Sequence, residues 1–141
     1  MKPVLQTDFA EYNDKGKQIK YGNCLQAAIA SVLELPLEEV PNFIMMGPDP
    51  SYGHYNMHKW LEERGIVMHR LREGRNWSFP TYHLAMGKTV RGTNHAVIYK
   101  EGRLAHDPHP DGTGLIEAKD LYILIPVDPS KIIFTETETN L

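Results

Sequence analysis

The chain shows its first clear apolar periodicity directly after Asn23. Positions i, i+3, i+4, i+7 and i+8 are occupied by Leu25, Ala28, Ile29, Val32 and Leu33, which is the spacing of an amphipathic helix. Asn23 is the expected N-cap of this helix, and Pro36 ends it because proline cannot continue a helix. The pattern therefore predicts a helix that begins at Cys24, with the thiol at the edge of its apolar face.

Further helical patterns follow this first helix. Residues 37–40 predict a short helix, and a longer helix is expected from about His54 to Arg64, with Gly65 as its terminator. Residues 1–22 have no clear periodicity, and we expect an extended lead-in with a turn at Asn13–Gly16.

Beyond residue 65 the pattern changes to strand-like runs. The expected strands cover residues 66–71, 77–86, 94–99, 103–106 and 121–125. Pro80 lies within the second run and lacks the N–H that a sheet needs. We therefore expect this run to be an edge strand or a strand interrupted at the proline. The runs 94–99 and 103–106 predict a hairpin around Glu101-Gly102, and both of its arms are apolar enough to be central in a sheet.

Helices followed by strands are typical of an α+β fold. With 141 residues, the chain is expected to form a single domain over residues 1–141 that is long enough to bury a core. The polar residues 135–141 are expected to form a mobile tail.

The composition narrows the possible functions. Hydrophobic residues make up 41% and charged residues 23% of the chain, which is ordinary globular usage. The net charge is −3 without a basic stripe, so we expect no nucleic-acid partner. No apolar signal stretch is present, and no run approaches the roughly 20 apolar residues of a membrane span. We therefore expect no membrane partner. The single cysteine cannot form an internal disulfide, which favours a reducing compartment, so we expect a cytoplasmic protein.

Cys24 is the main candidate for catalytic chemistry. A helix N-terminus stabilises an anion, which favours a thiol at this position as a nucleophile. A reactive thiol also needs a base, and His95 stands near the start of a predicted strand. Pairing about residues 100–103 brings position 95 opposite positions 106–108, so Asp107 is expected to orient His95. The pattern predicts a Cys24–His95–Asp107 triad.

Acyl chemistry at a thiol also needs donors for an oxyanion. The backbone N–H of Cys24 is one natural donor, and a side-chain amide upstream is the usual second. Gln6 and Gln18 both qualify, and the residues alone leave open which of them acts. Such a site needs no cofactor and no metal. Arg91-Gly92 and the segment Gly47–Tyr55 are candidate rim elements, with ordinary surface loops as an equal alternative.

Other interpretations of these residues stay open. Cys24 is also compatible with a structural thiol, because free cysteine is often buried. A zinc or iron site is a further alternative, with ligands His106, Asp107, His109 and Asp111. Two prolines in that segment oppose convergence of the four side chains. His54 and His58, spaced i, i+4, resemble half of a zinc site, and a solvated helix surface is the simpler explanation for them.

Several sequence blocks resemble known proteins: residues 3–7 (PVLQT), 22–27 (GNCLQA), 35–41 (LPLEEVP), 95–97 (HAV) and 106–110 (HDPHP). Together these blocks resemble a group of small uncharacterised proteins from bacteriophage and bacterial genomes. The Cys, His and Asp blocks are similar to papain-like cysteine peptidases, especially the branch resembling bacteriocin-leader (double-glycine) peptidases. The spacing from Gln18 to Cys24 is similar to the glutamine-to-cysteine spacing of that superfamily. In the phage group, the glutamine equivalent to Gln6 opens the sequence.

The resemblance implies a papain-like fold, in which N-terminal helices carry Cys24 and a C-terminal antiparallel sheet carries His95 and Asp107. It implies a cysteine-dependent hydrolase that acts on a peptide, a protein or a small amide. An acyltransferase with the same triad is a rival. Another rival is a non-catalytic phage-type protein that sequesters a host protein or a small signalling molecule, because one fold hosts many functions.

Overall fold

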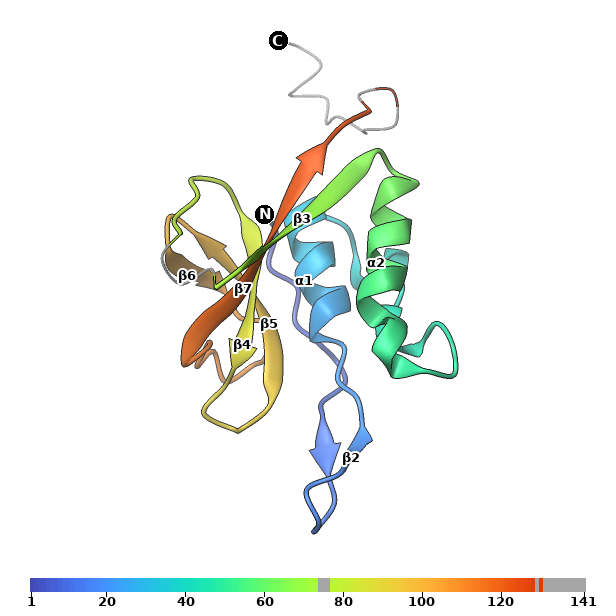
Figure 1. Cartoon of the computed structure of the whole chain (residues 1–141), viewed down its shortest axis with the longest axis vertical. Coiled ribbons are helices and arrows are strands. Elements are labelled where there is room, and N and C mark those ends of the chain that lie inside the picture. The colour runs from blue at the N-terminus through green and yellow to red at the C-terminus, as the bar shows by residue number, and fades with distance from the viewer. Residues whose placement is uncertain (74–76, 129, 131–141) are drawn as a thin grey trace.

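The structure, a computed structural model, describes residues 1–73, 77–128 and 130. It is a mixed α+β fold in which helices precede an antiparallel sheet, as predicted (Figure 1). The helical part holds α1 (Cys24–Leu33) and α2 (Gly53–Glu62), with short 3-10 helices at Leu37–Glu39, Phe43–Met45 and Pro50–Tyr52. None of the described helices is long and apolar enough to cross a bilayer. The predicted tail at 135–141 lies outside the described residues.

The main sheet of the described chain has five strands in the order β3–β7–β4–β5–β6, and all neighbours are antiparallel. The strands are β3 (Ile66–Arg72), β4 (His83–Lys88), β5 (Asn94–Lys100), β6 (Arg103–His106) and β7 (Glu117–Pro126). β7 follows the other four in sequence but lies between β3 and β4. The order of strands in space therefore differs from their order in the chain.

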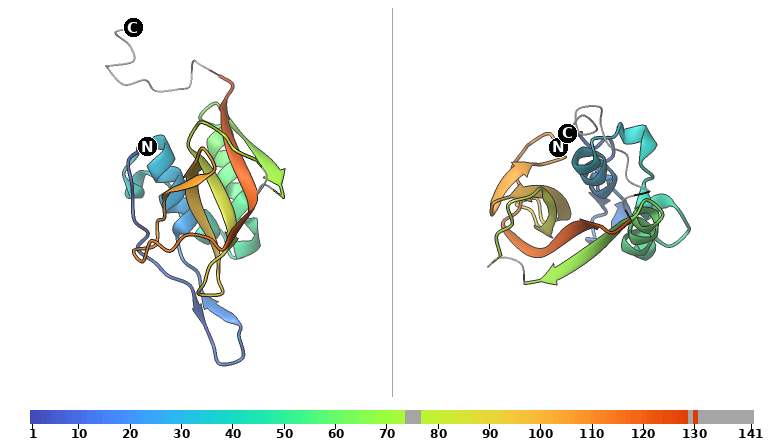
Figure 2. Two further views of the ribbon diagram at one scale, coloured as in Figure 1. Left: turned by 90° about the vertical axis from the view of Figure 1, so that its left-hand side faces the viewer. Right: turned by 90° about the horizontal axis from the view of Figure 1, so that it is seen from above.

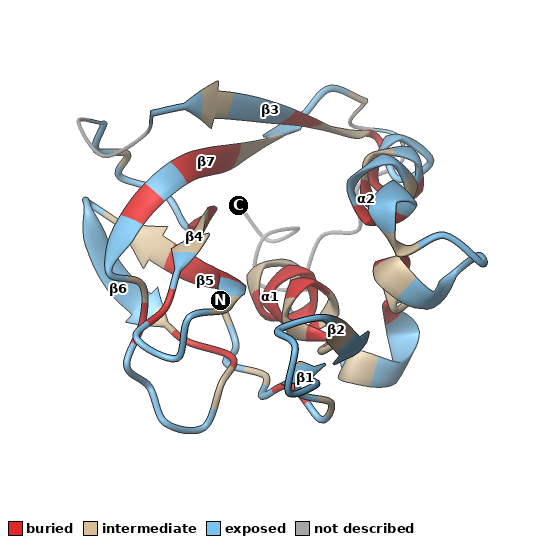
Figure 3. Cartoon of the chain, turned by 60° about the horizontal axis from the view of Figure 1, so that its bottom comes forward, coloured by how far each residue is buried: buried red, intermediate tan, exposed pale blue. Residues whose placement is uncertain are grey.

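One expectation for this sheet is wrong, and another is confirmed in part. The apolar pattern makes β6 a central strand, whereas the structure places it at an edge, with Arg103–Ala105 exposed (Figure 3). Strand order depends on contacts between distant segments, which the composition of one strand does not determine. The run 77–86 becomes a strand only at His83, because Pro80 stays outside the ladder. The expected broken strand is therefore confirmed, whereas the alternative of an edge strand is wrong, because β4 pairs on both sides.

The N-terminal lead-in contains a small hairpin that periodicity did not predict. It is formed by β1 (Glu11–Tyr12) and β2 (Gln18–Lys20) and projects from the body of the molecule (Figures 1 and 2). The predicted turn at residues 13–16 is confirmed. The side-chain oxygen of Asn13 accepts a hydrogen bond from the N–H of Lys15 at 3.0 Å, which closes the turn locally.

The main core lies between the helices and one face of the sheet. Its fully buried members include Ile29, Phe43, Met57, Leu61, Leu84 and Ile98. α1 packs on β5 through small buried residues such as Ala28 and Ala96, which permits a close approach of helix and strand. Figures 1 and 2 show that α1 begins at the same end of the molecule as the loop leading into β5. This packing brings Cys24 and His95 to one place.

Candidate active site

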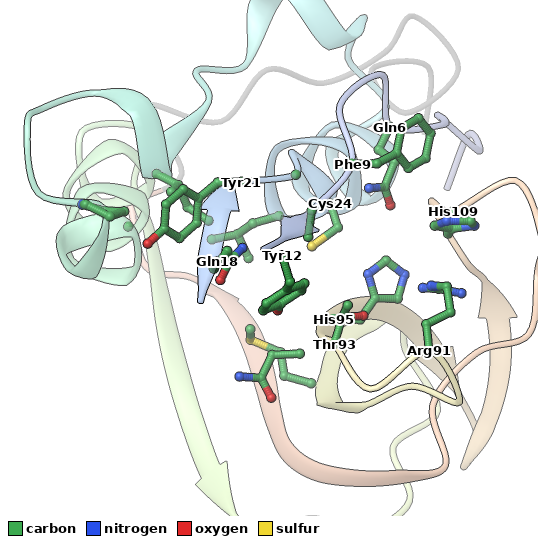
Figure 4. A pocket seen from close by; sticks show the side chains of 18 of the residues that line it. Gln6, Phe9, Tyr12, Gln18, Tyr21, Cys24, Arg91, Thr93, His95 and His109 are labelled. Atoms are coloured by element: carbon green, nitrogen blue, oxygen red, sulfur yellow. The ribbon is translucent and has the colours of Figure 1, made fainter. Parts of the chain in front are cut away.

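Cys24 is the first residue of α1, so its thiol lies at the positive end of the helix dipole. The thiol is free and half-buried. It borders a cavity of about 470 Å³, and in Figure 4 its sulfur faces the ring of His95. The structure thus has the thiol where the apolar pattern predicts it, at the first residue of a helix. The cavity lies next to this helix start.

His95 and Asp107 form a buried pair beside the thiol. Nε2 of His95 lies 2.6 Å from Oδ1 of Asp107, and the two side chains are 4% and 1% exposed. Oδ1 of Asp107 also accepts the backbone N–H of His109 at 2.9 Å, and Oδ2 accepts the N–H of Gly114 at 2.8 Å. These donors fix the carboxylate, and the carboxylate fixes the imidazole, leaving Nδ1 as the ring nitrogen available to the thiol.

The ionisation of this pair departs from ordinary values. Burial acts to lower the pKa of His95, but its hydrogen bonds with Asp107 and Cys24 raise that pKa from 6.5 to about 9. Burial acts to raise the pKa of Asp107, but the bond from His95 and two backbone N–H groups lower it from 3.8 to about 2. At neutral pH the pair is therefore an imidazolium against a carboxylate, the state that supports a thiolate nearby.

The hairpin that carries this pair has a different register from the predicted one. Ile98 pairs with His106 and Tyr99 with Leu104, with an irregularity between the two pairs. The ladder therefore ends at His106, and position 95 has no ladder partner at 106–108. Asp107 reaches His95 from the loop after β6. The predicted contact is confirmed, while the register from which it was predicted is wrong, because the local bulge shifts the strands.

The two candidate glutamines occupy different places around the thiol, although both line the cavity. Gln6 is 7% exposed, and in Figure 4 its amide lies near Cys24 and His109. Its Nε2 donates to the carbonyl oxygen of Asp8 at 2.9 Å, while Oε1 is buried without a partner among the described residues. An amide nitrogen carries two hydrogens, so one hydrogen of Gln6 stays free for a ligand.

Gln18 lies in the projecting hairpin, on strand β2. It is half-buried, and its Nε2 donates to the carbonyl oxygen of Lys20 at 3.2 Å. In Figure 4 its amide is on the other side of Cys24 from His95. Its position therefore depends on a two-stranded hairpin, whereas Gln6 is held by the body of the protein.

Asn23 is a site residue that sequence reasoning missed. It occupies the predicted N-cap position of α1, but its side chain makes no capping hydrogen bond. Its Oδ1 instead accepts the backbone N–H groups of Thr7 and Asp8, both at 2.9 Å. Asn23 thereby holds the segment that carries Gln6 against the start of α1. Nothing in the sequence distinguishes this role from capping, because both need an asparagine before the helix.

Gly22 allows the same two segments to approach. A Cβ atom at this position would lie 3.0 Å from the carbonyl oxygen of Asp8 and 3.3 Å from Nε2 of Gln6. Contacts this short would displace the backbone at Asp8 or the amide of Gln6. The glycine therefore suits a close approach of two parts of the chain, where a side chain would make the neighbouring atoms shift by a few tenths of an ångström.

The cavity in front of the thiol is lined mainly by apolar and aromatic side chains: Phe9, Tyr12, Tyr21, Leu25, Ile44 and Met86. Of the predicted rim elements, Arg91 and residues 50, 51, 53 and 54 border it. His109, considered from sequence only as a metal ligand, also lines the cavity and lies edge-on to the ring of His95, with centroids 6.2 Å apart.

The alternative metal cluster does not assemble in the described chain. Nε2 of His106 lies 2.8 Å from the carbonyl oxygen of Val4, and Asp107 is committed to His95. His109 and Asp111 face each other at 3.1 Å. No group of three or more His, Cys, Asp or Glu side chains among the described residues is arranged to hold a metal ion.

His54 and His58 share α2 but do not face a common site. His54 stacks on Tyr122, with ring centroids 5.5 Å apart, and its Nε2 lies 3.3 Å from the sulfur of Met86. His58 pairs with Glu62 at 3.2 Å. The i, i+4 spacing of the two histidines is therefore explained by separate contacts.

Comparison with known proteins does not identify a family for this chain. No protein-family model, no curated protein and no solved structure matches the chain. The features that bear on function are consequently the chain's own. They are a free thiol at a helix start, a buried imidazolium–carboxylate pair beside it, and a cavity in front of both.

Proposed function

We propose that the protein is a cysteine-dependent hydrolase of papain-like design that cleaves an amide, peptide or related acyl bond. The observation that carries the proposal is the 2.6 Å contact between His95 and Asp107, buried beside the thiol of Cys24. A structural cysteine has no need of a charged, buried partner. Strongly shifted titratable groups beside a cavity are typical of functional sites.

The first half of the reaction acylates the thiol. The sulfur of Cys24 attacks the carbonyl carbon, a C–S bond forms, and the thiol proton resides on Nδ1 of His95. The carbonyl oxygen becomes an oxyanion, which accepts hydrogen bonds from the backbone N–H of Cys24 and from Nε2 of Gln6. His95 then gives its proton to the leaving nitrogen, the C–N bond breaks, and a thioester is left.

The second half releases the acid. Water attacks the thioester carbon and gives a proton to His95, and the C–S bond then breaks. Cys24 recovers its proton from His95, and the carboxylic acid departs. Asp107 stays ionised throughout, orienting the imidazole and stabilising its protonated form.

Gln6 is the preferred second oxyanion donor. Its amide is buried beside Cys24, and Asn23 holds the residues that follow it. One of its two amide hydrogens is used by Asp8, which orients the other without consuming it. Gln18 is assigned to the cavity wall, because the hydrogen bond of its amide within the described chain is made inside the projecting hairpin. The apolar lining of the cavity favours an aromatic or aliphatic acyl group.

The proposal is tested with the p-nitrophenyl ester of N-acetylphenylalanine, an activated substrate whose acyl group suits the apolar cavity. We expect a burst of p-nitrophenolate stoichiometric with protein and a mass increase of one acyl group at Cys24. Cys24→Ala is expected to abolish the burst and His95→Gln to slow it at least 100-fold, a typical cost of losing an acid–base group. His58→Gln is the matched control and keeps the burst. A burst retained in Cys24→Ala, or none in the unmodified protein, contradicts the proposal.

A further inference from the structure

A second cavity also borders His95. It has a volume of about 280 Å³ and extends over β3, β4 and β7. His54, Met86, Asn94 and His95 border both cavities, but Cys24 and Gln6 border the first cavity alone. The two cavities are therefore neighbours that share these four residues, His95 among them, and the thiol borders one of them.

The chemistry of acyl transfer assigns different occupants to the two cavities. The acyl carbon must reach Cys24, and its oxygen must reach Gln6, so the acyl group occupies the first cavity. The leaving nitrogen takes its proton from His95 and must lie on the imidazole side of that carbon. Resting on the proposed function, we infer that the second cavity receives the leaving amine and selects an amine that carries a carboxylate, bound by Lys119.

The charges around the second cavity support this occupant. Apart from His95, whose charge is matched by Asp107, its charged lining consists of Arg70, Lys119 and Asp120. Arg70 is paired with Asp120 at 2.7 Å, whereas Lys119 forms no ion pair with any described residue. Burial and the charge of Arg70 lower the pKa of His54, so that ring adds no charge at neutral pH. One cationic group is left over, and an anion is its complement.

A β-bulge in β7 places Lys119 on the border of this cavity. Asp120 pairs with Met86 and Ala118 with Gly87, so Lys119 is an extra residue in β7. Consecutive residues of a regular strand point to opposite faces, yet Lys119 and Asp120 border the same cavity. Bulges redirect side chains in this way beside active sites.

The bulge depends on a glycine in the neighbouring strand. A Cβ atom at Gly87 would lie 2.2 Å from the carbonyl oxygen of Glu117, so no other residue fits there without moving the backbone. The bulged β7 and the glycine opposite it are therefore matched features of the sheet. Their joint result is a lysine beside the leaving-group side of His95.

The size of the cavity limits the occupant. Its volume of about 280 Å³ lies just below the roughly 300–1,000 Å³ of pockets that enclose drug-sized ligands. A single amino acid fits this scale, either one with a free α-carboxylate or one with an acidic side chain. The inferred substrate is an acyl amino acid or a peptide. The bond cleaved is the one directly before a C-terminal residue or before a residue with an acidic side chain.

The test uses amine capture of the acyl-enzyme. After acylation of Cys24 by the p-nitrophenyl ester, an added amine competes with water: the C–S bond breaks, a C–N bond forms, and a proton of the amine passes through His95 to the sulfur. The amines are glycine (α-carboxylate), glutamic acid α-amide (side-chain carboxylate), glycinamide (neutral) and lysinamide (cationic). Comparing their capture ratios between variants cancels their different intrinsic reactivities.

We expect Lys119→Gln to reduce capture of the preferred carboxylate amine relative to glycinamide by about tenfold, the scale of one charge-assisted hydrogen bond. Lys119→Glu is expected to reverse the preference towards lysinamide. Lys59→Gln, on the exposed face of α2, is the matched control and leaves the ratios unchanged. Whether glycine or glutamic acid α-amide shows the effect identifies the source of the carboxylate.

Different outcomes overturn the amine-binding role of the second cavity and the proposed hydrolase function. A normal burst with capture ratios that are equal in the unmodified protein and Lys119→Gln overturns this inference alone, and so does a normal burst without capture of any amine. The absence of a burst at Cys24 overturns the proposed function, and the inference falls with it.

Discussion

Asn23 binds Thr7 in two ways: its Oδ1 accepts the backbone N–H of Thr7 at 2.9 Å, and its Nδ2 donates to the Thr7 hydroxyl at 3.0 Å. Asn23 directly precedes the thiol, and Thr7 directly follows Gln6. The contact therefore sets the position of the proposed oxyanion donor relative to the nucleophile.

Asn23→Ala removes the acceptor of the Thr7 and Asp8 N–H groups. We expect it to lower the free energy of unfolding by about 1–3 kcal/mol and to slow the p-nitrophenolate burst, because Gln6 is no longer held. Asn23→Asp keeps the acceptor and is expected to recover part of both losses. Urea unfolding and burst kinetics measure the two effects. Equal losses in both variants would show that the acceptor contributes nothing.

The two glutamines are separated by paired substitutions. Gln6→Leu is expected to reduce the burst rate by about 10²–10³, the usual cost of losing one oxyanion donor, while Gln18→Leu stays near the rate of the unmodified protein. Stopped-flow measurement of p-nitrophenolate release gives both numbers. The reverse ranking would assign the oxyanion to Gln18 and the projecting hairpin.

Asp107→Asn tests the carboxylate as a positioning group. Both oxygens of Asp107 accept hydrogen bonds, so an amide must turn its NH₂ towards at least one donor. We expect the free energy of unfolding to fall by about 2–4 kcal/mol. The pKa of His95, measured by NMR titration of its ring, is expected to fall from about 9 towards 6.5. Asp111→Asn is the control, and an unchanged titration of His95 in Asp107→Asn would rule out the proposed coupling.

The same pair predicts how stability depends on pH. The unfolded chain loses the His95 proton near 6.5, whereas the folded protein keeps it up to a pKa of about 9. The contribution of His95 is therefore complete below pH 6.5 and is lost as the pH rises through about 9. Asp107, with its pKa lowered from 3.8 to about 2, contributes above pH 3.8 and loses its contribution as the pH falls through about 2.

Urea unfolding between pH 5 and pH 10 measures the alkaline part of this dependence. We expect the free energy of unfolding to decline from about pH 6.5 upward in the unmodified protein and to do so less steeply in His95→Gln. His58→Gln, which alters a half-exposed histidine, is expected to keep the slope. Identical slopes in the unmodified protein and His95→Gln would contradict the raised pKa.

Local patterns predicted much of this molecule. The apolar spacing after Asn23 predicted α1, and the structure has it from Cys24 to Leu33. The contact between His95 and Asp107 was also predictable, because a hairpin keeps its two arms close whatever its exact register. These features depend on residues that are near one another in the chain.

Features that depend on distant segments were not predictable. The central position of β4 requires β7, which arrives some thirty residues later and pairs with it. The proposed choice of Gln6 over Gln18 rests on Asn23, whose side chain reaches back to Thr7 and Asp8. A single sequence shows which residues are present but not which distant backbone groups they will meet.

The N-terminal segment is hydrogen-bonded to the chain on either side of Asp107. The N–H of Gln6 donates to the carbonyl oxygen of Pro108 at 2.9 Å, and His106 meets the carbonyl oxygen of Val4, which is 102 positions away in the chain. During synthesis, Gln6 and Cys24 therefore leave the ribosome long before their partners exist. For the proposed thiol hydrolase, the growing chain therefore carries Cys24 before His95 and Asp107 have been made, so its nucleophile has no base until folding is nearly complete.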